Sequence, residues 1–173
     1  VIGGGLLGQI TCQLLNANGC NVVAIDLSDK MVDMINKYKF ATAINRNSDN
    51  LIAFCQSFTD GYGFDKVIIT AKAPNNDPII LSSEILKKKG EIIIVGEVPM
   101  DIPREPYFYK NELGLKISCS YGPGRYDPNY EEEGNDYPYG YVRWTEKRNM
   151  EAFLNLVSKG SINLKPLITN IFD

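Results

Sequence analysis

Four glycines lie within the six residues Gly3–Gly8, and an apolar helix pattern begins inside them. Glycine loses more conformational freedom on folding than any other residue, so this density indicates a backbone that something must approach closely. The spacing of Gly3, Gly5 and Gly8 matches G-x-G-x-x-G, and an acidic residue, Asp26, follows 18 residues after Gly8. Between a strand and a helix, this pattern predicts a dinucleotide site in which a pyrophosphate lies against main-chain amides at the helix start.

Other glycine-rich patterns fit less well. The phosphate loop of nucleotide hydrolases, G-x-x-x-x-G-K-[ST], would use Gly3 and Gly8 but finds Gln9 where lysine is needed. The short-chain dehydrogenase pattern G-x-x-x-G-x-G would use Gly4 and Gly8 but meets Ile10 at its third glycine. A methyltransferase fold also combines a glycine-rich first turn with an acid after the second strand, and a purely structural turn needs no ligand. Both of these alternatives stay open.

Asp26 also predicts which dinucleotide binds. A carboxylate at the end of the second strand accepts hydrogen bonds from the adenosine ribose hydroxyls and repels a 2′-phosphate. NAD is therefore favoured over NADP. Lys30, four residues further on, either lies near the adenosine and softens that discrimination or is a solvated side chain in the first turn of a helix.

Strand and helix patterns alternate along the chain. Apolar, β-branched runs predict strands at residues 1–2, 21–26, 40–44, 65–71, 90–96, 115–121 and 167–171. A first helix is predicted to begin within the glycine turn. Helical spacing predicts further helices at 29–35, 51–58, 77–89, 107–113 and 145–158. The helix at 77–89 is expected to end in three lysines, whose positive charge suits the carboxyl end of a helix dipole. Continuous apolar strands are typical of a parallel sheet covered on both faces. The expected fold is α/β, a Rossmann-type doubly wound parallel sheet of about six strands.

The chain length of 173 residues predicts one domain over 1–173, with an aromatic loop at 121–144 and the helix at 145–158 inside it. Val1–Ile2 has the composition of the end of a strand, so we expect the chain to be a piece of a longer polypeptide.

Composition excludes several partners. Eighteen basic and 21 acidic residues give a net charge of −3 without a basic stripe, so no nucleic-acid partner is expected. Because no apolar run reaches the roughly 18 residues of a membrane span, a soluble, cytoplasmic protein is expected. The four cysteines are scattered, which predicts buried thiols in a reducing compartment. The lack of histidine removes the commonest general base and zinc ligand, and no metal site is expected in this chain.

The order of several segments resembles the cofactor domain of the medium-chain dehydrogenase/reductase family, the zinc-type alcohol dehydrogenases, over essentially the whole chain. That resemblance is carried by VIGGGLLGQITCQLLNANGCNVVAIDLSDK, FTDGYGFDKVIITA and KKKGEIIIVGEV. A closer similarity is to bacterial members that are joined to a glucose-fructose-oxidoreductase-like domain and linked to polysaccharide biosynthesis. It is carried by MDIPREPYFYKNE and SYGPGRYDPNYEEEGNDYPYGYVRWTEKRNMEAF.

The resemblance implies positions around the cofactor. The matching positions are Gly3, Gly5, Leu7, Gly8, Asp26, Thr70, Ala71, Gly96, Glu97 and Val98. The first four match the pyrophosphate turn and Asp26 the ribose acid. Residues 70–71 match the strand end beside the adenosine ribose, and residues 96–98 match the strand end that borders the nicotinamide. For these two segments, plain strand termini remain the alternative.

In the family, zinc and the proton relay belong mainly to a preceding barrel-like domain that this sequence lacks. We therefore expect no catalytic residue here and an inactive isolated chain, with zinc supplied only by the missing domain. In the intact protein the resemblance implies NAD-dependent hydride transfer to or from an alcohol or sugar-like hydroxyl, and a homodimer joined at sheet edges. A non-catalytic dinucleotide-binding or assembly module is the alternative.

The loop at 121–144 concentrates six of the ten tyrosines and the only tryptophan, together with Arg125 and Arg143. Aromatic rings beside arginine are typical of sugar-binding and protein-binding surfaces, and a loop that packs its rings on its own sheet would look the same. Arg125 and Tyr126 are the candidate substrate residues, because they follow a Gly-Pro-Gly turn beyond the expected carboxyl end of a strand.

Overall fold

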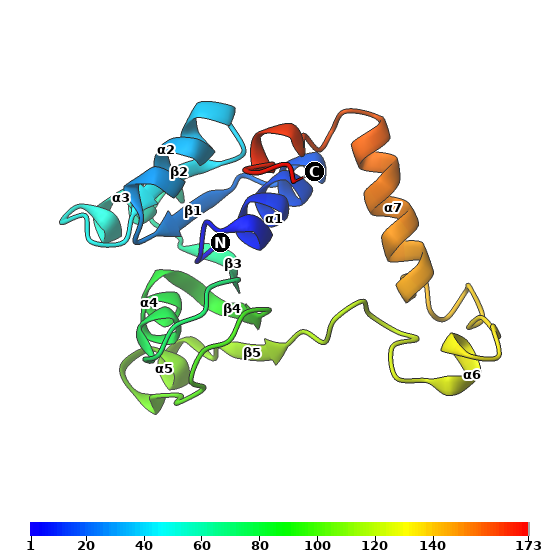
Figure 1. The fold of residues 1–173 in the computed structure, drawn as a ribbon. Helices are drawn as coiled ribbons and strands as arrows, with labels where there is room; N and C mark the ends of the chain where they lie inside the picture. The colour runs from blue at the N-terminus through cyan, green and yellow to red at the C-terminus, as the bar shows by residue number, and fades with distance from the viewer. Residues whose placement is uncertain (173) are drawn as a thin grey trace. The chain divides into compact units, whose positions relative to one another are not determined.

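The computed structural model describes residues 1–172, and the chain divides into two compact units, residues 1–117 and 118–173 (Figure 1). The expectation of one domain over the whole chain stays a prediction.

A parallel sheet forms the first unit. Its strands are β1 (Val23–Asp26), β2 (Thr42–Asn45), β3 (Phe64–Ile69), β4 (Leu86–Ile94) and β5 (Gly114–Ile117). β1 pairs with β2, and β3, β4 and β5 pair in that order, all in parallel. Ile2 forms parallel bridges to Ile25 of β1 and Ile69 of β3, which joins the two groups. The resulting order, β2-β1-Ile2-β3-β4-β5, is that of a dinucleotide-binding sheet, so the α/β prediction is confirmed.

Helices connect these strands. They are α1 (Leu6–Ala17), α2 (Asp29–Tyr38), α3 (Leu51–Phe58), α4 (Asp77–Ile85) and α5 (Tyr109–Asn111), the last following a kinked segment at Arg104–Phe108. α2 packs on β1 and β2, and α4 packs on β3 and β4.

Three predictions about the strands are wrong. Within residues 1–172 the sheet has five strands and one bridging residue, fewer than the six expected. Residues 167–171 form no strand: Leu167 is the last residue of a 3₁₀ turn, Lys165–Leu167, and residues 168–171 are irregular. The strand expected at 115–121 ends at Ile117.

The lysine run also lies elsewhere than predicted. α4 ends at Ile85, so Lys87–Lys89 belong to the start of β4 and not to a helix terminus. A register shift between Phe64 and Lys66 of β3 accommodates them, and Lys89 adopts a left-handed φ of 61°. The conformation of the lysine run therefore depends on its pairing with β3, which is distant in sequence, and not on local helix propensity.

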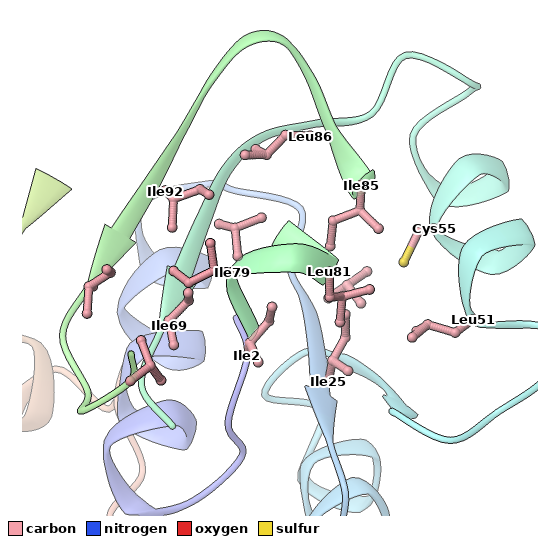
Figure 2. Packing of buried hydrophobic residues seen from close by; sticks show 14 of the residues in the cluster. Ile2, Ile25, Leu51, Cys55, Ile69, Ile79, Leu81, Ile85, Leu86 and Ile92 are labelled. Atoms are coloured by element: carbon pink, nitrogen blue, oxygen red, sulfur yellow. The ribbon is translucent and has the colours of Figure 1, made fainter. Parts of the chain in front are cut away.

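The core is built from isoleucines of the central strands packed against α4. Figure 2 shows Ile2, Ile69 and Ile92 around Ile79, and all four are at most 6% exposed. Full burial of such a side chain contributes about 1.5–3 kcal/mol. The core therefore fixes the strands whose carboxyl ends carry the glycine turn.

Two of the four cysteines are buried, as predicted, and two are not. Cys12 and Cys55 are buried, and burial raises the pKa of Cys55 to about 11. Cys20 and Cys119 are exposed, so the prediction is wrong for these two. In the described part of the chain, no helix has the length and apolar character needed to cross a bilayer.

The second unit contains α6 (Pro128–Glu131), α7 (Glu146–Ser158) and the 3₁₀ turn. Some rings of the aromatic loop pack within it: Tyr130 stacks on Tyr137 with centroids 5.4 Å apart, and the Tyr137 hydroxyl donates to Asp127. Other rings are exposed, among them Tyr126 and Tyr141.

A charge ladder crosses β3, β4 and β5. Glu91 accepts from Lys66 at 2.5 Å and from Lys116 at 2.6 Å. Both ammonium groups favour the carboxylate form, and they lower the pKa of Glu91 to about 2.

We expect Glu91→Gln to flatten the acid dependence of stability. A carboxylate with a depressed pKa stabilises the fold fully above its ordinary pKa of 4.5, and this contribution is lost as the pH falls towards 2. Thermal unfolding followed by circular dichroism at pH 7, 4, 3 and 2 should show a smaller fall in melting temperature for the variant. Glu112→Gln, which removes a carboxylate with one partner at 3.4 Å, is the control. Equal acid dependence of wild type and Glu91→Gln would contradict the ladder.

Candidate functional site

Close main-chain packing fixes the glycine turn. Gly3 has φ +101°, and a Cβ there would lie 2.6 Å from the Ala71 nitrogen at the end of β3. A Cβ on Gly8 would overlap the Gly3 carbonyl oxygen. Thr70 reinforces the contact, because its hydroxyl donates to that same oxygen at 2.7 Å. Gly3 and Gly8 therefore bring α1 against the strand ends, as the motif predicts.

The middle glycine of the motif, Gly5, lies in open space. Apart from Gly5 and its two chain neighbours, no residue has an atom within 4 Å of the position that a Cβ on Gly5 would occupy. Gly5 is the N-cap of α1, no side chain caps this end, and the first turn carries no acid. The first N–H groups of a helix have no partner within the helix, and its dipole makes this end positive. The arrangement is suited to an anion that approaches the backbone at Gly5.

Asp26 ties the end of β1 to the glycine turn. Its Oδ2 accepts from the Gly4 amide at 2.6 Å, and its Oδ1 accepts from the Ser28 amide at 2.8 Å. Each carboxylate oxygen has two lone pairs, so both retain one for a ligand hydroxyl. The carboxylate can therefore position the turn and bind a ribose at the same time.

Gln9, in the first turns of α1, has a role that was not predicted from the sequence. Its side chain is 3% exposed, and Nε2 donates to the Gly4 carbonyl at 2.8 Å. Its Oε1 has no partner among the described residues. The sequence offered one signal, a polar residue in an otherwise apolar stretch of helix.

A cleft of about 620 Å³ opens at the carboxyl ends of the strands. Its lining residues include Gly3, Gly5, Asp26, Arg46, Asn47, Thr70, Ala71, Lys72 and Asp77. Five predicted cofactor residues thus share one cleft, while Arg46, Asn47, Lys72 and Asp77 were not predicted. Ligands of doubly wound sheets bind at this end of the strands.

A second cleft, of about 450 Å³, lies between the amino ends of β1 and β3. Val23, Val67 and Ile85 are among its largely apolar lining residues. It lies at the opposite ends of the strands from the glycine turn and contributes no group to the candidate site.

Residues 96–98 lie next to the end of β3. The Gly96 amide donates to the Ile69 carbonyl, and a Cβ on Gly96 would overlap the Ala71 oxygen. Glu97 forms an exposed ion pair with Lys72 at 2.8 Å, and Val98 is buried. Gly96 is therefore required by packing, and a cofactor contact of this segment stays a prediction.

Three other predicted residues of the first unit are not among those that line the cleft. Leu7 and Gly8 belong to the first turn of α1, and Lys30 is exposed on α2. Arg125 pairs with Glu131 at 2.6 Å inside the second unit.

The guanidinium of Arg125 lies 4.4 Å from the Tyr126 ring centroid. The predicted role of these two residues in substrate binding stays a prediction.

The described residues fit a dinucleotide and do not fit zinc. The open position at Gly5 and the uncapped start of α1 suit a pyrophosphate, and Asp26 suits a ribose. Within residues 1–172, no three His, Cys, Asp or Glu side chains gather as metal ligands.

Comparison with known proteins gives a consistent result. A family model described as zinc-binding dehydrogenase matches residues 7–133. A zinc-type alcohol dehydrogenase-like protein of Escherichia coli is 24% identical over 174 residues, covering 100% of this chain and 42% of that protein. L-threonine 3-dehydrogenase of Caldanaerobacter subterraneus subsp. tengcongensis is 30% identical over 139 residues, covering 78% of this chain and 38% of that protein.

Among solved structures, galactitol-1-phosphate dehydrogenase from Escherichia coli has a TM-score of 0.68 at 20% identity, over 97% of this chain and 44% of that one. This likeness shows the Rossmann-type fold. The chain spans about two fifths of the length of the curated relatives it matches. From the family match over residues 7–133, the chain belongs to the zinc-binding dehydrogenase family, within the medium-chain dehydrogenases.

Proposed function

We propose that this chain binds NAD within an oxidoreductase that transfers hydride between the nicotinamide and an alcohol or sugar-like hydroxyl. The observation that carries the proposal is the Asp26 carboxylate, which is held by the Gly4 amide beside an uncapped helix start in the 620 Å³ cleft. Family membership supports the same reading, because the relatives named above are dehydrogenases.

In this proposal the chain binds and orients, and NAD supplies the hydride chemistry when bound. The α1 amides near Gly5, with Leu7 and Gly8 in the same turn, would hold the pyrophosphate. Asp26 would hold the adenosine ribose. The segments 70–71 and 96–98 would border the rest of the cofactor, and no step is assigned to zinc because the described residues lack a metal site.

Finer parts of the proposal come from the sequence. Similarity to bacterial members linked to polysaccharide biosynthesis favours a sugar-like substrate, with Arg125 and Tyr126 as candidate contacts. Four cysteines without disulfide partners favour a reducing cytoplasm. The sheet edge at β5 is our candidate for the homodimer contact.

Asp26→Asn should change the preference between dinucleotides. The substitution removes the charge that repels a 2′-phosphate and one acceptor for the ribose, and hydrogen bonds to charged groups contribute about 1.5–3 kcal/mol. We expect NAD to bind roughly tenfold more weakly, and NADP to lose less or gain. Isothermal titration calorimetry of the purified protein with both dinucleotides measures the ratio of their affinities.

The ratio of the two affinities separates a loss of ribose recognition from a loosening of the glycine turn. A looser turn would weaken the binding of both dinucleotides to the same extent, because both contain the pyrophosphate. Asp29→Asn, an acid in the first turn of α2, controls for the loss of one charge. An unchanged ratio in Asp26→Asn would exclude Asp26 from ribose recognition. A larger thermal shift of the wild type with S-adenosylmethionine than with NAD would favour the methyltransferase alternative.

A new acid at the start of α1 should have opposite effects on stability and binding. Leu6 is 60% exposed, and Leu6→Glu places a negative charge at the positive helix end, which stabilises a helix by about 0.3–1 kcal/mol. The same charge would repel a pyrophosphate, so we expect several-fold weaker NAD binding that recovers in part at 0.5 M salt. Calorimetry and thermal unfolding give the two readouts. Leu154→Glu, on exposed Leu154 of α7, is the matched control, and unchanged NAD affinity in Leu6→Glu would rule out this anion site.

A further inference from the structure

An ion pair closes one wall of the candidate cleft. Arg46 follows β2 directly, and Asp77 is the first residue of α4. The guanidinium binds the carboxylate in bidentate fashion, with Nε 3.0 Å from Oδ2 and Nη2 2.5 Å from Oδ1. The two side chains are 30% and 44% exposed. Planar two-point contacts of this kind fix the orientation of a guanidinium as well as its position.

The backbone places this pair beside Asp26. β1 and β2 pair in parallel with Asp26 opposite Asn45, and the Arg46 amide donates to the Asp26 carbonyl at 2.8 Å. Arg46 therefore leaves the sheet next to the residue proposed to bind the ribose. Asp77 is held at the start of α4, where the helix dipole favours a carboxylate.

The cations of the cleft are all neutralised. Among the described residues that line it, the two cations are Arg46 and Lys72. Asp77 binds Arg46, and Glu97 binds Lys72 at 2.8 Å. Asp26 thus remains as a charge without an ion-pair partner in the cleft, so the ribose end has a negative balance.

A 2′-phosphate needs a free cation at this place. Arginine is the usual partner of that phosphate in dinucleotide sheets, because its fork matches the phosphate oxygens. The chain has such an arginine in the cleft wall, and its donors Nε and Nη2 are occupied by the Asp77 carboxylate.

We propose that Asp77 determines cofactor specificity by sequestering the Arg46 guanidinium, so that the cleft selects a dinucleotide that lacks a 2′-phosphate. The inference rests on the proposed function and deepens it. It assigns the exclusion of NADP to two acids with different actions: Asp26 repels the phosphate directly, and Asp77 withholds the cation that would attract it.

Asp77→Asn tests the inference by releasing Arg46. In calorimetric titrations of the purified protein with NAD and NADP, we expect the ratio of affinities to shift about tenfold towards NADP, and the shift to shrink at high salt. Asp77→Ser, which keeps a hydroxyl acceptor at the start of α4, is the second variant if Asp77→Asn lowers the melting temperature below that of the assay.

Two further variants show whether a shift in the ratio comes from the release of the Arg46 guanidinium or from a loosening of the cleft wall that the ion pair holds. Arg46→Gln breaks the same ion pair without freeing a cation, so its ratio should not shift towards NADP. The double variant Asp77→Asn/Arg46→Gln should lose the gain of Asp77→Asn. Asp65→Asn, which breaks the exposed Lys87 ion pair near the amino end of β3, is the matched control and should match wild type.

The outcomes distinguish the two proposals. NAD binding by wild type with an unchanged ratio in Asp77→Asn and Asp77→Ser overturns the role of Asp77 and leaves the proposed function standing. Retention of the gain in the double variant also overturns it, because Arg46 would not be the cation responsible. Binding of neither dinucleotide by wild type overturns the proposed function and this inference with it.

Discussion

Close packing of main chain at the carboxyl ends of the central strands is the constraint on which the site depends. Gly8 lies against the Gly3 carbonyl, Gly3 against Ala71, and Gly96 against the Ala71 oxygen, with no room for a Cβ at any of the three glycines. This packing brings the start of α1 over the sheet. It also places the Gly4 amide within 2.6 Å of the Asp26 carboxylate, so the acid is fixed by the same turn that it borders. Gly5, which has free space around it, is the exception that leaves the backbone accessible.

The arrangement of charged groups differs between the two ends of the sheet. Near the amino ends, lysines and acids form exposed pairs such as the Lys66–Glu91–Lys116 ladder, which belong to the fold. At the carboxyl ends, a positive helix terminus and a lone carboxylate share one cleft. A ligand with a diphosphate and a neighbouring pair of hydroxyls complements both groups at once. Because the cleft holds its own cations in ion pairs, an additional phosphate near Asp26 would find no free partner.

Local sequence was sufficient for features that depend on local geometry. The glycine spacing and Asp26 were predicted because a tight turn, a helix start and a strand end are each set by a few consecutive residues. The strands expected at 40–44 and 65–71 formed within a few residues of those positions for the same reason. Lys87–Lys89 were misplaced because a bulge against β3 and a contact with Asp65 decide their conformation. The Arg46–Asp77 ion pair was not predicted, because it joins residues that lie 31 positions apart in the sequence. The hydrogen bond from Gln9 to the Gly4 carbonyl was not predicted either, because it depends on a turn that packs against distant strands.

A dinucleotide bound at the start of α1 should change the environment of the main-chain amides there. Titration of the isotopically labelled protein with NAD, followed by amide chemical shifts in two-dimensional NMR, measures this change residue by residue. We expect the largest changes at Gly4, Gly5 and Leu6, with smaller changes at the end of β1. Changes confined to the opposite ends of the strands, around Val23 and Val67, would contradict dinucleotide binding at the glycine turn.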